Sequence, residues 1–374
     1  MAMKINGQRL REARAFRGLT ITQLAEKVGV SKQMISRYEH DRSNISLETF
    51  MKIIEKLHFP MNFFTGEAKF VYTNEGTFYR SRLTSTQIEK KPSETYKQAA
   101  AILRDYFEQY IDFPMLDLID EVDSPEEAAY KLRNLWQLGN LPIDNMVEVL
   151  ESHGITVVNT NMEAKKVDAV GGYAKINRNR YYVVINNFTE GSYYRTQFSL
   201  AHELGHYIYH ANPDSDNIAE YREMEKEADR FASSFLLPHD AFMETLKSID
   251  VMDLNAYVPL KEQWNVSIAA MLSRARKLRV IDDNQYQRLQ KSISYHRWRK
   301  HEPGDDKKPA MPTMLHDSFR LMQQHMNTTA SELAQKIAEE YGYDYPKELL
   351  ACLLGIDISE FNEKGSLLKF RVDD

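Results

Sequence analysis

The chain has 374 residues, of which 43% are hydrophobic and 27% are charged. This is the composition of an ordinary globular protein that is long enough for two or three domains. No stretch approaches the ~18 consecutive apolar residues that a membrane-spanning helix needs, and the start lacks the apolar core of a signal peptide. We therefore expect a cytoplasmic protein without a membrane partner. The single cysteine, Cys352, excludes an internal disulfide or a Cys-based metal site, so any metal must be held by His and carboxylates.

The net charge of −6 is unevenly distributed. Residues 1–64 contain 11 of the 48 Lys and Arg but only 6 of the 54 Asp and Glu. Lys and Arg that displace counterions from phosphates supply most non-specific DNA affinity. The N-terminal segment is therefore the part whose charge suits a polyanion.

The N-terminal segment predicts a domain of five short helices. Thr20 and Gln23 form a capping box at the start of the second helix, Gly29 ends that helix, and Ser31 caps the third. Two short helices joined by a turn that contains Gly are typical of a helix-turn-helix. The predicted helices span residues 7–17, 20–28, 31–39, 46–57 and 60–64.

The run LTITQLAEKVGVSKQMISRYEHDRSNISLETFMKIIEKL resembles the Xre/Cro-type repressor family, and the resemblance covers residues 4–64. It implies that the third helix lies in the major groove of duplex DNA. Ile21 stands where the family often has Gln, so a phosphate contact is lost or shifted to a neighbour. The expected DNA contacts are Thr22, Gln23, Lys32, Gln33, Ser36, Arg37 and Arg42. The alternative is a helical oligomerisation domain with an incidental basic face.

The middle of the chain predicts an α+β unit behind a connector. The connector has a strand pair near residues 69–83 and an aromatic-rich helix at 96–110. Residues 171–176 and 181–185 predict a hairpin. If 181–185 is a sheet edge, an extended substrate can pair with it. Further helices are expected at 125–138 and 142–153, with a strand at 155–159.

The helix after the hairpin carries the motif His202-Glu203-Leu-Gly-His206. Two His residues four positions apart leave the same face of a helix, one turn apart, and can chelate one ion. Glu203 points beside that ion, where a general base must sit to take a proton from a water on zinc. The motif therefore predicts zinc-dependent hydrolysis.

A catalytic zinc of this class needs a third protein ligand. Glu225 borders the buried stripe of the next predicted helix, and Asp229 lies one turn further on the same face. We expect Glu225 to be the ligand and Asp229 to accept the outer N–H of a ligating His. Glu223 and Glu227 are alternatives, although a solvated position fits them better.

Four stretches of this region resemble the ImmA/IrrE family of metallopeptidases, over residues 125–300. The resemblance implies Zn²⁺ on His202, His206 and Glu225, with Glu203 as the base. It also implies cleavage of a partner repressor of the helix-turn-helix type. The fusion of both modules in one chain departs from the family's two-gene arrangement. The stretches are LRNLWQLGNLPIDNMVEVLESHGITVV, RTQFSLAHELGHYIYH, EKEADRFASSFLLP and WNVSIAAMLSRARKLRVI.

The sequence thus predicts a mainly α fold with a small α+β core. We expect a five-helix DNA-binding domain, a zincin-like domain with a short β-sheet, and a helical tail that follows a linker near residue 300. The expected domains are 1–66, the connector 67–124, 125–300 and 301–374.

The predicted function is that of a DNA-binding regulator with zinc-dependent endopeptidase activity, which cleaves a repressor-type protein or itself. We expect a homodimer that binds duplex DNA through residues 1–66. The alternative is a repressor or antitoxin whose protease-like domain is only a sensor. In another alternative, residues 264–281 form a second DNA-contacting helix pair.

Overall fold

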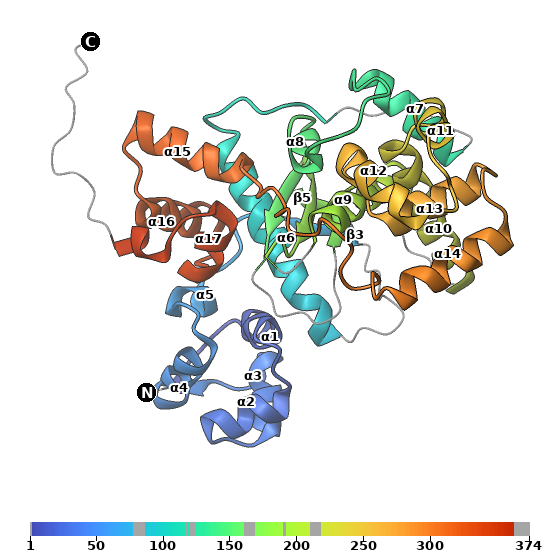
Figure 1. Ribbon diagram of the computed structural model, residues 1–374. Helices are drawn as coiled ribbons and strands as arrows, with labels where there is room; N and C mark the ends of the chain where they lie inside the picture. Colours follow the sequence, from blue (N-terminus) through green and yellow to red (C-terminus); the bar gives the residue numbers. More distant parts are fainter. Residues whose placement is uncertain are drawn as a thin grey trace, which may run out of the picture.

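The structure, a computed structural model, describes residues 2–77, 87–116, 119, 124–160, 169–189, 192–209 and 218–362. Figure 1 shows a small helical unit at the N-terminus, a larger body around a β-sheet, and a group of C-terminal helices above the small unit. The fold is mainly helical with one four-stranded sheet, so the predicted fold class is confirmed.

The N-terminal unit contains the five predicted helices. The capping box of Thr20 and Gln23 and the cap from Ser31 are both present. Arg14 and Glu39 tie the first helix to the third through a buried, two-pronged ion pair at 2.5 and 3.0 Å. The helices are α1 (Gly7–Phe16), α2 (Ile21–Val28), α3 (Lys32–Glu39), α4 (Leu47–Leu57) and α5 (Met61–Thr65). A two-residue pairing of β1 (Ala2–Met3) with β2 (Ile45–Ser46) closes the unit.

The four-stranded sheet has the order β3-β5-β6-β4. Its strands are β3 (Tyr72–Thr77), β4 (Thr156–Asn159), β5 (Ala169–Ile176) and β6 (Asn179–Asn186). The predicted hairpin is confirmed as β5 and β6, which pair antiparallel, while β4 runs parallel to β6.

Two features of the strand pairing could not be predicted from the sequence. Residues 181–185 lie in β6, which is flanked by β5 and β4, so a substrate cannot add to them as to a sheet edge. The strand expected in the connector is β3, and it pairs with the distant β5. The rest of the connector's expected strand pair, residues 78–83, lies outside the described residues.

Helix α6 (Gln87–Phe107) is the element on which the other parts meet. Its buried apolar side chains belong to one hydrophobic cluster that also contains residues of the N-terminal helices, of β5 and β6, and of the C-terminal helices. In Figure 1, α6 runs past the sheet toward the N-terminal unit. The connector is therefore a structural centre of the molecule.

Buried in this centre, Lys97 gives the fold a pH dependence. Its ammonium group donates to the carbonyl of Tyr173 at 3.2 Å, and burial lowers its pKa to about 7. The unfolded chain binds this proton up to its ordinary pKa, so stability rises with pH between about 7 and 10. We expect Lys97→Met to raise the melting temperature at pH 6 and to lose that advantage at pH 10. The melting temperatures are measured by scanning calorimetry. An equal increase in melting temperature at pH 6 and at pH 10 would contradict this account.

The body is completed by helices around a second hydrophobic cluster. They are α7 (Pro125–Leu135), α8 (Met146–Glu151), α9 (Tyr193–Tyr209), α10 (Ile218–Leu236), α11 (His239–Lys247), α12 (Tyr257–Trp264), α13 (Ile268–Lys277) and α14 (Asp283–Tyr295), with the short 3-10 helix η1 (Leu254–Ala256). No helix in the described part of the chain is long and apolar enough to cross a membrane.

The C-terminal helices dock on the N-terminal unit. Arg9 of α1 donates to the carbonyls of Phe63 and Gly342, at 3.2 and 2.9 Å, and its guanidinium lies 3.4 Å from the ring centroid of Tyr343. Arg9 is only 2% exposed, so this contact is an internal one. The helices concerned are α15 (Met314–Met326), α16 (Ala330–Tyr341) and α17 (Lys347–Leu354), followed by the 3-10 helix η2 (Ile358–Asn362).

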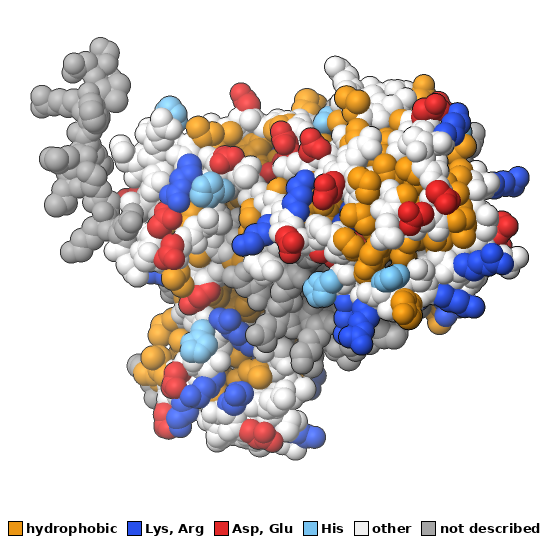
Figure 2. All heavy atoms as spheres, in the orientation of Figure 1, with side chains coloured by type: hydrophobic (Ala, Val, Ile, Leu, Met, Phe, Trp, Pro, Cys, Tyr) orange, Lys and Arg blue, Asp and Glu red, His pale blue; other side chains and the backbone are white. Residues whose placement is uncertain are grey.

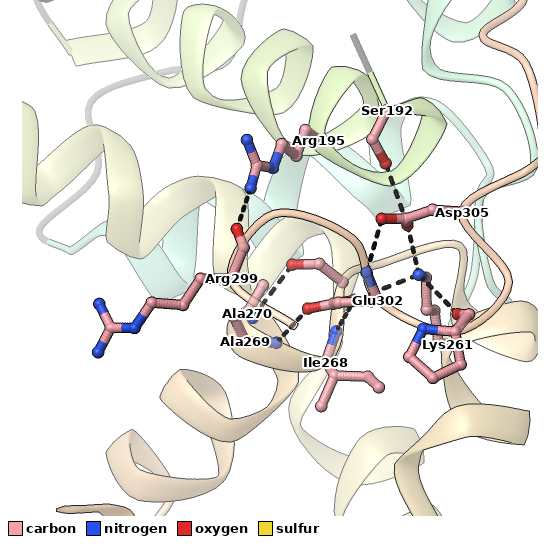
Figure 3. Close-up of polar contacts among 11 residues, drawn as sticks. Ser192, Arg195, Lys261, Ile268, Ala269, Ala270, Arg299, Glu302 and Asp305 are labelled. Atoms are coloured by element: carbon pink, nitrogen blue, oxygen red, sulfur yellow. Dashed lines mark hydrogen bonds and ion pairs between the residues drawn. The ribbon is translucent and has the colours of Figure 1, made fainter. Parts of the chain in front are cut away.

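The segment expected as a linker near residue 300 is irregular but firmly packed. Figure 3 shows Glu302 against the start of α13, where it accepts from the backbone N–H groups of Ile268 and Ala269. The buried ammonium of Lys261 contacts Asp305 at 2.5 Å and Glu302 at 3.3 Å. These contacts hold residues 302–305 against the body.

Candidate metal centre

Helices α9 and α10 bring the predicted ligands together. His202 and His206 lie one turn apart on α9, and both are buried, at 4% and 1% exposure. Glu225 comes from α10, which packs along α9 through a stripe that includes Phe231. Suitable ligand atoms of the three residues all lie within 4.8 Å of one another.

The distances show three groups that face a common point. The Nε2 atoms of His202 and His206 are 3.0 Å apart. The carboxylate of Glu225 lies 3.3 Å from Nε2 of His206 and 3.6 Å from Nε2 of His202. Among the alternatives, Glu223 instead pairs with Lys226 and Arg230 on the exposed side of α10.

Asp229 determines which nitrogen of His202 faces that point. Its carboxylate lies 2.9 Å from Nδ1 of His202. With a proton on Nδ1, the lone pair of the neutral ring is on Nε2, toward Glu225. Such an outer partner orients a ligating imidazole and raises its basicity.

The electrostatics of this group favour an ionised carboxylate. Burial alone would raise the pKa of Glu225, but contacts with His206, His202 and Tyr221 outweigh it and hold the pKa at about 2. Burial likewise opposes protonation of His202, yet the hydrogen bond to Asp229 and the nearby carboxylates raise its pKa above the usual value. The pocket thus concentrates negative charge around two imidazoles.

This donor set fits a divalent cation. A neutral imidazole lone pair, a second imidazole and an ionised carboxylate face a common point at short range, so a cation at that point would be within reach of all three donors. Two His nitrogens and one carboxylate oxygen, without thiolate, are among the ligand sets that zinc accepts. The three residues therefore form a candidate metal centre.

Glu203 lies beside this group, between α9 and the sheet. Its side chain is 3% exposed, and its backbone carbonyl accepts a hydrogen bond from the hydroxyl of Tyr182 at 2.9 Å. A Cβ added to Gly171 of β5 would lie 2.7 Å from Oε2 of Glu203 and from the Tyr182 hydroxyl. The sheet thus approaches Glu203 so closely that any side chain at position 171 must displace Glu203 or Tyr182.

We expect Gly171→Ala to damage the geometry of Glu203 without disturbing the candidate metal ligands. The added methyl group must displace either Glu203 or Tyr182, and small misplacements at a reacting centre can cost about 100-fold in rate. Metal content, measured by mass spectrometry, should stay at the wild-type value, while any reaction that uses Glu203 as its base slows. A variant that keeps the full rate would show that Glu203 tolerates displacement.

The predicted DNA-contact residues lie mostly on one face of the N-terminal unit. Lys32, Gln33, Ser36 and Arg37 of α3 line a concave surface together with Thr22, and the cavity there has a volume of about 930 Å³. Gln23 has its side chain bonded to the backbone of Thr20 in the capping box, while Arg42 is exposed beyond α3. The same surface includes Lys91 of α6.

Sequence reasoning missed the neighbours of Glu203 and Glu225. Tyr182 and Tyr221 are buried tyrosines with no motif around them. Gly171 could have been recognised in the sequence, because a glycine inside a predicted strand indicates that another group approaches the backbone closely there. The paired glycines of β5 could have been interpreted in that way.

Comparison with known proteins assigns both regions. Residues 10–64 match the family described as helix-turn-helix, and residues 150–276 match the IrrE N-terminal-like domain. Two curated relatives, HTH-type transcriptional regulatory proteins of Pyrococcus furiosus and Methanocaldococcus jannaschii, are 36% and 39% identical to this chain over 59 residues. The match covers 16% of this chain and 19% of each relative, so the chain spans about a fifth of their length.

The protein therefore carries a DNA-binding regulator domain of the helix-turn-helix class. Its second matched region is an IrrE-like domain, from a family of the metallopeptidase type. The predicted fusion of these two families in one chain is confirmed.

Proposed function

We propose that this protein is a DNA-binding transcription regulator with zinc-dependent endopeptidase activity. The observation that carries the proposal is the convergence of His202, His206 and Glu225 within 4.8 Å, with the buried Glu203 beside them. A binding protein that only senses a ligand has no need of an additional carboxylate next to a complete ligand set.

Each residue would have a separate task in hydrolysis. His202, His206 and Glu225 would hold the ion, and Asp229 would keep His202 in the required tautomer. When bound, zinc polarises a carbonyl group and makes a water molecule more acidic. Glu203 would take the proton of the attacking water and return it to the leaving amine.

We further propose that the substrate is a polypeptide, either a repressor of the helix-turn-helix type or this chain itself. The N-terminal unit, residues 1–66, would hold the protein on duplex DNA as a homodimer, because operators for such domains have paired half-sites. Proteolysis would then change the occupancy of a promoter.

The experiment compares wild-type protein with Glu203→Gln protein for bound zinc and for cleavage of candidate repressors. Zinc in both proteins with cleavage in the wild type alone supports the enzyme. Equal behaviour of the two proteins, with no fragments, supports the alternative of a regulator whose IrrE-like domain only senses a ligand or partner.

A further inference from the structure

Outside the N-terminal unit, positive charge is concentrated in one short part of the chain. Residues 274–300 contain nine Lys and Arg and two acidic residues, Asp282 and Asp283. The chain as a whole carries 48 Lys and Arg against 54 Asp and Glu. Residues 274–300 therefore have an excess of basic residues in a chain that is acidic overall, as the N-terminal unit does. It comprises the end of α13, the whole of α14 and the turns that follow.

Some of these cations have structural tasks. Arg274 is buried and donates to the carbonyl of Leu237 and the hydroxyl of Ser234. Arg276 pairs with Asp283 at 2.5 Å. These two residues are therefore not free to bind a ligand.

Of the seven remaining cations, the five on α14 and in the turns that follow it form an exposed surface, which we call the α14 basic surface. It consists of Arg288, Lys291, Arg297, Arg299 and Lys300, all exposed. None of the five has an ion pair with a carboxylate among the described residues, and residues 284–301 include no acidic residue at all. In Figure 2, Lys and Arg side chains gather along the lower edge of the body, over the region of α14.

The backbone beneath this surface is held in place. Leu289 and Ile293 anchor α14 in the core, each at 2% exposure. At the end of the helix the N–H of Trp298 returns to the carbonyl of Ile293 at 2.9 Å. Figure 3 shows Arg195 of α9 donating to the carbonyl of Arg299, at 2.6 Å. Charges on a fixed backbone lose less entropy when they bind a ligand.

Helix electrostatics explains only part of this arrangement. Cations near a helix C-terminus complement its dipole, which accounts for those just beyond Tyr295. Arg288 and Lys291 lie in the middle of α14, where this effect is absent, and Lys300 lies five residues beyond the helix. A run of exposed cations in a segment, residues 284–301, that contains no acidic residue suits a polyanion.

The neighbouring helix pair does not offer an alternative DNA-binding surface. For α12 and α13 to act as a second helix-turn-helix, the N-terminus of α13 would have to face DNA. Glu302 covers that N-terminus by accepting from Ile268 and Ala269. A carboxylate at this position would repel phosphate.

We propose that the α14 basic surface binds the phosphate backbone of duplex DNA beside the site of the N-terminal unit. The proposal rests on DNA binding by that unit, which holds the body close to the duplex and raises the effective concentration of phosphate. Its contacts are independent of base sequence, so they add affinity and extend the footprint without altering the preferred operator.

The test measures the affinity of the full chain for a fluorescent duplex as a function of salt. The duplex has a random sequence and extends beyond the footprint of the N-terminal unit. The variant carries Arg297→Gln, Arg299→Gln and Lys300→Gln together. Each lost phosphate contact lowers the salt slope by about 0.9, so we expect a decrease of up to about 2.7 and an affinity about 10- to 100-fold weaker.

A matched variant removes three exposed lysines elsewhere, with Lys131→Gln, Lys247→Gln and Lys308→Gln. It has the same net charge and should retain most of the slope. Equal salt slopes in the two triple variants would overturn the proposal. It would also be overturned if the first triple variant lost affinity for single-stranded RNA but kept its affinity for the duplex. If the N-terminal unit does not bind DNA, Lys32→Gln and Arg37→Gln will not change the affinity for the duplex. This result separates a failure of DNA binding by the N-terminal unit from a failure of the α14 basic surface to bind.

Arg297→Gly separates binding from folding. Arg297 has φ of 61°, a left-handed conformation that glycine adopts more readily. The variant should therefore be as stable as the wild type while its DNA affinity falls. Unchanged affinity in this variant and in the triple variant would overturn the proposal.

Discussion

Replacing Glu203 by Gln should slow the proposed peptide hydrolysis by about 10²- to 10⁴-fold and leave the fold and the metal content unchanged. Gln has nearly the same shape but cannot take a proton, and a general base contributes about 10²- to 10⁴-fold to a rate. Glu203 is outside the group of His202, His206 and Glu225, so the variant should bind as much metal as the wild type. The measurement is the single-turnover rate of repressor cleavage, with zinc content determined in parallel.

Glu223→Gln is the matched control, because Glu223 lies on α10 but pairs with Lys226 and Arg230 at the exposed side. It removes the same charge and should cleave at the wild-type rate. A Glu203→Gln protein that cleaves as fast as this control would exclude Glu203 as the base. Loss of zinc in the Glu203 variant alone would instead assign Glu203 to the metal.

Replacing Gly342 by Ala should loosen the contact between the C-terminal helices and the N-terminal unit. Gly342 has φ of 71°, and an added Cβ would lie far closer to the carbonyl oxygen of Glu67 than van der Waals contact allows. A left-handed conformation costs Ala about 1–2 kcal/mol, and overpacking against backbone adds about 1–3 kcal/mol. We therefore expect the free energy of unfolding to fall by about 3 kcal/mol, measured from the shift in the denaturant midpoint.

Gly355→Ala provides the comparison. Gly355 also has positive φ, at 61°, but the nearest atom to its added Cβ is a side-chain atom of His316 at 3.6 Å. Only the conformational cost of about 1–2 kcal/mol applies there. If both variants lose the same stability, the close approach of Gly342 to Glu67 makes no contribution.

The parts of the fold that follow from local rules could be predicted from the sequence. Thr20, Gln23 and Ser31 mark helix starts because their side chains satisfy backbone groups within three residues. The spacing of His202 and His206 likewise needs no knowledge of the rest of the chain, since a helix alone places them one turn apart.

The parts that depend on distant pairing could not be predicted. Strand β3 pairs with a strand about 100 residues away, and its own sequence does not encode that partner. Tyr182 and Gly171 meet Glu203 only because the sheet packs on α9. The central position of α6 was missed for the same reason, because its contacts come from both ends of the chain.

The docking of the N-terminal unit on the C-terminal helices determines whether self-cleavage of the chain would release that unit. Arg9 bonds to Gly342, the backbone N–H of Lys69 bonds to Tyr341, and buried aromatic rings from both parts lie in one hydrophobic cluster. A nick between α5 and β3 would leave two fragments that stay associated, as complementing halves of a split protein do. Release of the C-terminal fragment from DNA would then need a second event that separates the two fragments. In gel filtration of the nicked protein, we expect the two fragments to elute together.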